Sequence, residues 1–304
     1  MRVLASRRFP GPAWDALGDV GVEWPVSGLR RGVEVLAVVA ATVDEALLEL
    51  LPDLRLVANY GVGYDGIDVE ACARRGIAVT NTPEALGVAT ADLTMALVLA
   101  TRRRLVEGDR FVREGKWASG WVVGDLLGDE IGGATLGIIG LGRIGGAVAT
   151  RARAFGMNVL HARRQDVGSP DRRELDDLLR ESDVVTIHAP LTDETLGLLD
   201  ARRLALLRDG ACLINTARGA IVDEDALVAE LTSGRLRAGL DVYAHEPHVP
   251  KALLGLPNVV LSPHVGSATP ATREAATAEL VANILAALER RPLPNPVPGS
   301  ATVS

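Results

Sequence analysis

The sequence predicts an α/β protein built from two doubly wound parallel sheets. Short runs rich in Val, Ile and Leu alternate with amphipathic segments along most of the 304 residues. These runs are apolar on both faces, as strands are when helices cover both sides of a parallel sheet. One set of runs precedes a long helical stretch from about Thr90 to Gly115, and a second set begins at Leu136. We therefore expect two such domains.

The expected elements follow one another in βαβ order. The strand runs are VLAVVA, LRLVANYG and IAVTNTP in the first set, and TLGIIGLG, MNVLHARR, VVTIHAP, CLINTARG and GLDVYA in the second. Helical periodicity marks Glu174 to Glu181, Asp223 to Leu231 and Thr272 to Arg290. The tail RRPLPNPVPGSATVS is rich in Pro and Ser, so we expect that it does not pack. We place one domain at residues 1–95 plus 268–304 and the other at residues 96–267.

Composition favours a protein that handles small molecules. The formal net charge is −7 with both signs interspersed, so no broad basic field invites nucleic acid or an anionic membrane. The two cysteines, Cys72 and Cys212, give neither a disulfide framework nor the spacing of a metal site. The first residues lack the apolar core of a signal peptide, and no uncharged run approaches the ~20 residues that cross a bilayer. We expect a cytoplasmic protein without a metal.

A glycine-rich turn predicts a dinucleotide site. In GIIGLGRIG, Gly140, Gly142 and Gly145 follow a strand run and open an amphipathic segment, with Arg143 and Ile144 at its start. In this arrangement the first glycine allows the tight turn, the second lets the backbone approach the pyrophosphate, and the third lets helix and sheet pack closely. A bend made only for conformational reasons is the alternative, because glycines collect in turns.

The end of the next strand run bears on which dinucleotide binds. An acid that accepts a hydrogen bond from the ribose 2′-hydroxyl of NAD usually stands about 20 residues after the glycines. Here the sequence reads HARR, with Arg163 beside Arg164. A guanidinium pairs with a 2′-phosphate in a bidentate way, whereas a carboxylate repels it. We therefore expect NADP(H), and NAD(H) remains the alternative if the two arginines are only solvated surface residues.

Three further segments end an apolar run with a polar group. They are LINTARGAIVDEDAL, AGLDVYAHEP and VVLSPHVGSAT, and they present Arg218, Glu246 and His264. Open α/β sheets bind ligands at the carboxyl ends of their strands, which makes the three residues candidates for chemistry. Taken singly, each has a structural alternative: a capping arginine, a loop acid and a core histidine.

Together with the glycine turn, these segments resemble a known family, the D-isomer-specific 2-hydroxyacid dehydrogenases. The resemblance rests on NYGVGYDGID, NTPEALGVATADLTMALVLA, GIIGLGRIG, HAPLTDETLGLL, LINTARGAIVDEDAL, GLDVYAHEP and LSPHVGSAT, in this order and over nearly the whole chain. Within the family, TADL, GKW and PHVGSAT are most similar to glyoxylate and hydroxypyruvate reductases.

The resemblance implies a catalytic triad of Arg218, Glu246 and His264. His264 would give a proton to the carbonyl oxygen while hydride reaches the carbon, and Glu246 would orient the imidazole and favour its charged form. Arg218 would bind the carboxylate and carbonyl oxygens of the substrate. The backbone N–H groups of Val62 and Gly63 would hold the substrate carboxylate.

Weaker implications concern the cofactor and a second subunit. The resemblance makes Asp241 a ligand of the nicotinamide carboxamide. Further cofactor contacts are implied for Thr216, Ala217, Pro190 and Thr195. It also implies a homodimer formed through the Thr90 to Gly115 region, in which Trp121 reaches the active site of the neighbouring subunit.

We therefore expect an NADP(H)-preferring reductase of small 2-oxoacids such as glyoxylate or hydroxypyruvate, with its active site between the two domains. A reductase of a larger 2-oxoacid, such as hydroxyphenylpyruvate or a sugar acid, stays open. So does a nucleotide-sensing protein that binds a partner, as corepressors of this fold do. Formate dehydrogenases of the same superfamily pair their histidine with an amide, so Glu246 argues against that activity.

Overall fold

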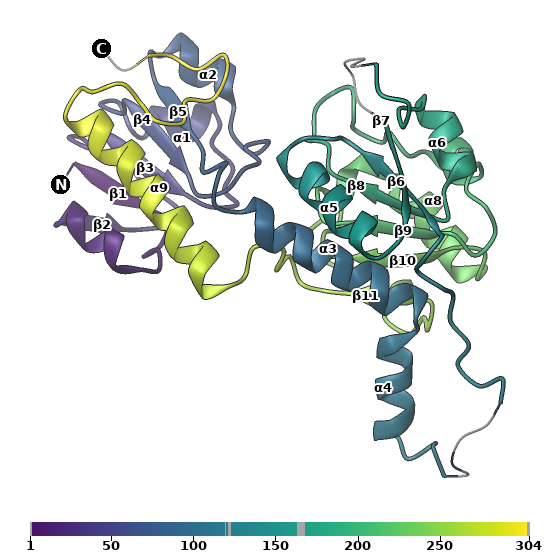
Figure 1. Ribbon diagram of the computed structural model, residues 1–304. Helices are drawn as coiled ribbons and strands as arrows, with labels where there is room; N and C mark the ends of the chain where they lie inside the picture. Colours follow the sequence, from purple (N-terminus) through teal and green to yellow (C-terminus); the bar gives the residue numbers. More distant parts are fainter. Residues whose placement is uncertain (1, 119, 121–122, 163–167, 303–304) are drawn as a thin grey trace. The chain divides into compact units, whose positions relative to one another are not determined.

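The computed structural model describes all residues except 1, 119, 121–122, 163–167 and 303–304. The chain forms two compact units, Met1–Gly87 with Ser267–Ser304, and Val88–Gly266. Each unit contains a parallel sheet with helices on both faces (Figure 1). The predicted fold class, two parallel-sheet α/β domains, is confirmed.

The first unit contains a five-stranded sheet in the order β2-β1-β3-β4-β5. Its strands are β1 (Val3–Ala5), β2 (Val20–Val22), β3 (Val35–Val38), β4 (Leu56–Asn59) and β5 (Ala78–Thr80). Its helices are α1 (Glu45–Glu49), α2 (Val69–Arg74), α9 (Pro270–Leu288) and the 3₁₀ turn η1 (Pro12–Leu17). Alternate strand residues enter two cores: Leu36 packs in the core with α1 and α2, and Val35 in the core with α9 and η1. This is why the strands are apolar on both faces.

The second unit contains a six-stranded sheet in the order β11-β10-β9-β8-β6-β7. Its strands are β6 (Thr135–Ile139), β7 (Asn158–Ala162), β8 (Val184–Ile187), β9 (Cys212–Asn215), β10 (Arg237–Leu240) and β11 (Val259–Leu261). From β6 the chain runs outward to β7 and then returns to β8 on the other side of β6. Open parallel sheets bind ligands at the carboxyl ends of the strands beside such a reversal.

Helices connect these strands. They are α3 (Gly87–Arg102), α4 (Leu105–Arg113), α5 (Arg143–Ala154), α6 (Leu175–Glu181), α7 (Ala201–Leu204) and α8 (Glu224–Thr232), with the 3₁₀ turns η2 (Gly219–Ile221) and η3 (Lys251–Leu253). Two of them, α7 and α8, start at an aspartate that caps the helix. The side chains of Asp223 and Thr269 cap α8 and α9 by accepting hydrogen bonds from the backbone N–H groups of Ala226 and Thr272. The predicted helices at Glu174, Asp223 and Thr272 are confirmed to within two residues at each end.

The predicted single helical stretch from Thr90 to Gly115 is wrong in one respect, because the structure has two helices there. The backbone of Arg104, between α3 and α4, is left-handed with a φ of 51°. Its guanidinium donates to both carboxylate oxygens of Glu107 at 2.7 Å and to the carbonyl oxygen of Leu127 at 3.3 Å. Leu127 lies on a later segment that returns to the junction of α3 and α4, and its bond with Arg104 contributes to holding the break between the two helices. Hydrophobic periodicity along the helices does not reveal this contact.

The expectation that the Pro-rich tail does not pack is also wrong. Val297 is 3% exposed, and its N–H donates to the carbonyl oxygen of Val79 at 2.8 Å. The N–H of Asn295 donates to the side chain of Asn283 on α9 at 3.0 Å. Every second residue from Pro292 to Pro298 is proline, so the residues between them keep the N–H groups that pair with the first unit.

The tail contact predicts a stability effect. Val297→Ala should lower the free energy of unfolding by roughly 1–3 kcal/mol, because it removes two buried methyl groups and leaves a cavity. Val22→Ala, at a side chain that is 57% exposed, should change it by about 0.5 kcal/mol or less. Urea unfolding followed by tryptophan fluorescence compares the two variants. Equal effects would mean that the tail does not contribute to the core.

Candidate active site

Three loops at one edge of the second sheet carry the predicted triad. Arg218 follows β9, Glu246 follows β10 and His264 follows β11, and these strands are neighbours in the sheet. The strands are parallel, so their carboxyl ends lie at the same edge. Residues separated by up to 46 positions in the sequence are thus delivered to one edge of the sheet.

His264 and Glu246 form a direct pair. The Nδ1 atom of His264 lies 2.7 Å from Oε2 of Glu246, and the N–H of Tyr243 donates to Oε1 of Glu246 at 3.1 Å. Burial raises the pKa of the Glu246 carboxyl, but these two hydrogen bonds and the charges of His264 and Arg218 outweigh burial, so the net pKa is lowered. An ionised carboxylate only accepts hydrogen bonds, so Nδ1 carries a proton. Nε2 is left as the ring atom that can exchange a proton with a substrate.

The loop that carries His264 is held by a buried carboxylate. Asp241 is 1% exposed, and its oxygens accept hydrogen bonds from the hydroxyl of Ser262 and from the N–H groups of Val265 and Gly266, the last two at 2.9 and 2.8 Å. The N–H of His264 also donates to the Asp241 carbonyl oxygen at 2.8 Å. These bonds hold His264 in a left-handed conformation with a φ of 52°. The implied contact of Asp241 with a nicotinamide carboxamide stays a prediction.

Tyr243 links the Glu246 and His264 loops. Besides the bond from its N–H to Glu246, its hydroxyl donates to the carbonyl oxygen of Ser262 at 3.0 Å. Burial raises the pKa of Tyr243 to about 12, so the phenol keeps the proton that it donates. Tyr243 is not among the functional residues that the sequence motifs predict. Its position between Asp241 and Glu246 in GLDVYAHEP was the available signal.

The Arg218 loop is held in shape by Asn215, a second residue that the sequence motifs do not predict. Asn215 is 1% exposed; its amide nitrogen donates to the carbonyl oxygen of Arg218 at 2.8 Å, and its oxygen accepts from the N–H of Ala217 at 3.0 Å. Next to Arg218, a Cβ on Gly219 would lie 1.9 Å from the carbonyl carbon of Tyr243. Only glycine allows the backbones of these two loops to come so close.

The predicted cofactor residues Thr216, Pro190 and Thr195 already make contacts within the protein. The Oγ1 atoms of Thr216 and Thr94 on α3 lie 2.9 Å apart, and the Thr94 hydroxyl donates to the carbonyl oxygen of Thr90. The hydroxyl of Thr195 donates to the carbonyl oxygen of Pro190 at 2.6 Å. Pro190 and Thr195 therefore belong to one ordered loop after β8.

The glycine turn has the shape that a dinucleotide phosphate needs. Gly140 has a φ of 94°, and a Cβ on Gly145 would lie 2.1 Å from the carbonyl oxygen of Gly140, so helix α5 packs tightly on the strand. A Cβ on Gly142 would meet nothing within 4 Å. Among the described residues, no side chain caps α5, and an uncapped helix start of this kind attracts anions. Arg143 and Ile144 are the first two residues of α5. These features fit a dinucleotide phosphate.

A second predicted anion site lies in the first unit. The carbonyl oxygens of Gly61 and Gly63 accept from the amide of Asn59, and that of Val62 accepts from the amide of Asn81. In the described part of the chain, the N–H groups of Val62 and Gly63 have no hydrogen-bond acceptor. The loop thus has its carbonyl groups occupied and two N–H groups free to bind a carboxylate.

Three other predicted residues, Arg163, Arg164 and Trp121, lie outside the described residues.

The fold and this set of loops define an NAD(P)-dependent oxidoreductase that acts on a hydroxyacid. Residues 95–266 match the sequence profile of the D-isomer specific 2-hydroxyacid dehydrogenase NAD binding domain. The chain belongs to the D-isomer-specific 2-hydroxyacid dehydrogenase family.

Individual relatives match over almost the whole chain. A glyoxylate reductase of Pyrococcus horikoshii is 48% identical over 96% of this chain and 90% of its own length. The crystal structure of the TT0316 protein of Thermus thermophilus is 45% identical with a TM-score of 0.90, covering 98% of this chain and 100% of that one. An NADPH-dependent glyoxylate/hydroxypyruvate reductase of Sinorhizobium meliloti, solved with NADP and malonate, is 34% identical with a TM-score of 0.91, covering 100% and 99%.

The open space at Gly142 predicts a selective binding defect. Gly142→Ala should weaken NADPH binding by about tenfold, because its methyl group would occupy the space where the backbone approaches the phosphates. Gly146→Ala is the matched control, since a Cβ there also meets nothing within 4 Å and lies one turn further along α5. Titration of each purified variant with NADPH, followed by nucleotide fluorescence, measures the dissociation constants. Unchanged binding by Gly142→Ala would show that the phosphates lie elsewhere.

Proposed function

We propose that this protein is an NADP(H)-preferring D-2-hydroxyacid dehydrogenase that reduces small 2-oxoacids, glyoxylate and hydroxypyruvate. The observation that carries the proposal is the His264–Glu246 pair, with Nδ1 and Oε2 2.7 Å apart. The pair lies at the edge of the sheet where the Arg218 loop leaves β9. A half-exposed imidazole that is hydrogen-bonded to an ionised carboxylate is suited to acid–base chemistry on a bound ligand.

A nicotinamide, when bound, would supply the hydride. His264 gives a proton from Nε2 to the substrate oxygen as negative charge develops there. Glu246 accepts the Nδ1–H bond, which orients the ring so that Nε2 faces the substrate. Arg218 stabilises the growing negative charge and binds the substrate carboxylate. The acid beside His264 argues against formate dehydrogenase chemistry, in which an amide stands there.

Two findings support small 2-oxoacids and NADP(H). Relatives that match over most of their length are glyoxylate reductases, and a structural neighbour is an NADPH-dependent glyoxylate/hydroxypyruvate reductase solved with NADP. In this chain, Arg163 and Arg164 stand in the sequence where an NAD-selective acid is usual. A D-lactate dehydrogenase of Aquifex aeolicus with the same fold was solved with NAD, so NAD(H) is the alternative that has to be tested.

Steady-state kinetics test the proposal. Wild type should oxidise NADPH faster than NADH with glyoxylate or hydroxypyruvate, and more slowly with hydroxyphenylpyruvate. His264→Ala should lower kcat by about 10²–10⁴-fold because the proton donor is lost. Arg163→Asp should shift the ratio of kcat/KM for NADPH and NADH towards NADH, because a carboxylate repels the 2′-phosphate.

Each part of the proposal has its own contrary result. A preference for hydroxyphenylpyruvate would assign the enzyme to larger 2-oxoacids. An unchanged cofactor ratio in Arg163→Asp would remove the basis for NADP(H) selectivity. Wild type that binds NADPH but reduces none of these acids would favour the nucleotide-sensing binding protein instead. Lys251→Ala, at an exposed position on η3, is the control variant for surface charge.

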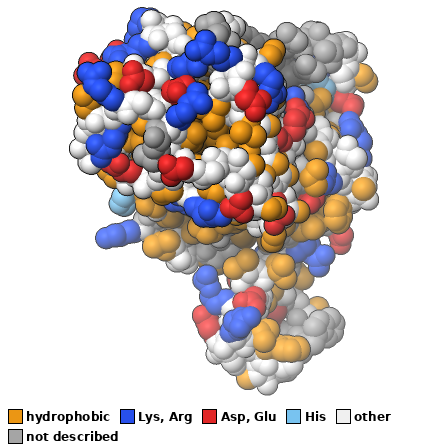
Figure 2. Space-filling model, turned by 90° about the vertical axis from the view of Figure 1, so that its left-hand side faces the viewer, with side chains coloured by type: hydrophobic (Ala, Val, Ile, Leu, Met, Phe, Trp, Pro, Cys, Tyr) orange, Lys and Arg blue, Asp and Glu red, His pale blue; other side chains and the backbone are white. Residues whose placement is uncertain are grey.

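We further propose a cytoplasmic homodimer formed through α4 and the segment that follows it. Leu105, Val112 and Trp117 are 63%, 56% and 59% exposed, and a groove of about 350 Å³ lies between Val112, Trp117 and Leu126. Figure 1 shows α4 extending away from the sheet, and Figure 2 shows apolar side chains on this protrusion at the bottom of the view. An exposed apolar surface of this kind is typical of an interface.

In the described chain, no helix is long and apolar enough to span a membrane.

The dimer proposal predicts the effect of a buried charge. Val112→Glu should convert the protein to a monomer, because a carboxylate buried in an apolar interface lacks a partner. Arg113→Glu places the same carboxylate at the next, charged position of α4 and should leave the dimer intact. Light scattering coupled to size-exclusion chromatography gives the mass of each. A monomeric wild type at micromolar concentration would contradict the proposal.

A further inference from the structure

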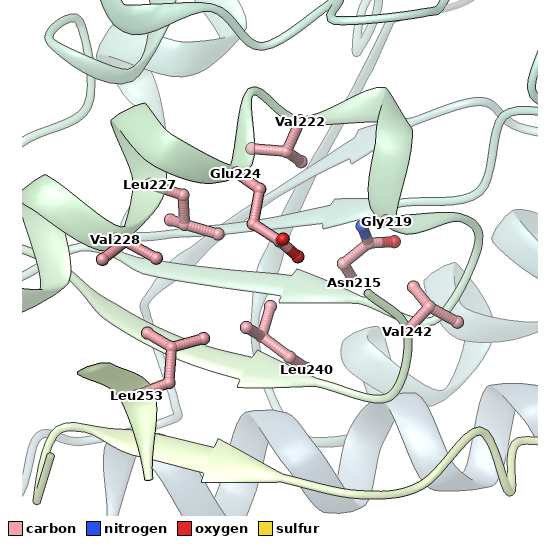
Figure 3. A pocket seen from close by; sticks show the side chains of 9 residues that line it. All are labelled: Asn215, Gly219, Val222, Glu224, Leu227, Val228, Leu240, Val242 and Leu253. Carbon is pink, nitrogen blue, oxygen red and sulfur yellow. The ribbon is translucent and has the colours of Figure 1, made fainter. Parts of the chain in front are cut away.

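Glu224 directs a carboxylate inward beneath the Arg218 and Glu246 loops. It is the first residue of α8, where an acid ordinarily faces solvent and interacts with the helix dipole. Figure 3 shows its carboxylate pointing instead into a small cavity of about 10 Å³. Most of the other side chains that line the cavity are apolar, among them Val222, Leu227, Leu240 and Leu253. A carboxylate in such apolar surroundings requires a hydrogen-bond donor.

The donor belongs to the turn that carries Glu246. The N–H of Ala244 donates to Oε1 of Glu224 at 2.9 Å, and the N–H of the preceding residue, Tyr243, donates to Glu246 at 3.1 Å. Two carboxylates therefore hold two successive N–H groups of one turn. The orientation of the peptide between them is fixed from both sides.

The same turn is confined by the Arg218 loop. Because a Cβ on Gly219 would lie 2.3 Å from the nitrogen of Ala244, the backbones of the two loops leave no room between them. Glu224 lies five residues after Gly219 on the same connection between β9 and β10. One segment thus provides Arg218, the glycine contact and the carboxylate that binds the turn.

We propose that Glu224 is a positioning residue for the proton transfer, because it holds the 243–246 turn so that Glu246 meets Nδ1 of His264. This inference rests on the proposed function, in which His264 gives the proton. Glu224 acts through Glu246 and does not touch the substrate. The exposed Asp225 in the same turn provides an acidic side chain that can interact with the α8 dipole, so this interaction does not require Glu224.

Three variants separate positioning from helix stabilisation. Glu224→Met has a similar volume but no acceptor, so kcat for glyoxylate reduction should fall about tenfold while KM for NADPH stays within about twofold. Glu224→Gln keeps an acceptor oxygen for the N–H of Ala244 and should retain most of kcat. Asp225→Met is the matched control and should behave as wild type. If Glu224→Met does not fold, Glu224→Ala replaces it, with thermal melting to establish the fold.

A second measurement does not depend on turnover. The proton on Nδ1 of His264, hydrogen-bonded to a carboxylate, should give a downfield NMR signal, identified by its absence in His264→Ala. The signal should disappear or shift in Glu224→Met and persist in Glu224→Gln and Asp225→Met. An unchanged signal and kcat in Glu224→Met would overturn the proposal, as would an equal loss in Asp225→Met. A signal change in a protein that reduces no 2-oxoacid would contradict the proposed function but support the positioning role.

Discussion

The candidate site depends on a buried carboxylate that forms no ion pair with any of the described residues. Asp241 is 1% exposed, and desolvating a charge is costly unless its oxygens accept good hydrogen bonds. They receive bonds from one hydroxyl and two backbone N–H groups, all from residues 262 to 266. The cost of burying the charge is therefore offset only when this segment folds around Asp241. That requirement fixes the backbone of His264 in the left-handed conformation, which a histidine rarely adopts by itself.

The rest of the site is built from similar cross-connections between loops. Tyr243 donates to Glu246 with its N–H and to the His264 loop with its hydroxyl, while Asn215 folds the Arg218 loop. Each strand end by itself offers one functional side chain and little rigidity. The parallel order β11-β10-β9 places the three ends side by side, so that the loops can bind each other. Rigid placement of an acid and its partner lets a site act without reorganising during the reaction.

The glycine turn before α5 depends instead on the absence of side chains at particular positions. Gly145 permits the close contact of α5 with the strand, and Gly142 leaves open space at the helix start. The helix N–H groups then supply the attraction for an anion. The loop at Val62 and Gly63 in the first unit is similar, because amide side chains occupy its carbonyl groups and leave N–H groups to bind an anion.

The sequence by itself determined the α/β class, the helices at Glu174, Asp223 and Thr272, the glycine turn and the identity of the triad candidates. The fold class, the helices and the glycine turn follow from local patterns of hydrophobic periodicity and glycine spacing, whereas the triad candidates follow from polar residues at strand ends together with the family resemblance. Only the tertiary structure decided that the helical stretch breaks at Arg104, that the tail packs through Val297, and that Asn215, Tyr243 and Glu224 support the loops. The bonds of Asn215 lie within its own loop. The other features depend on a hydrogen-bond partner or packing neighbour from another segment, such as Leu127, Val79 or Ala244. Hydrophobic periodicity does not encode such partners, because it reports which face of an element is buried and not what covers it.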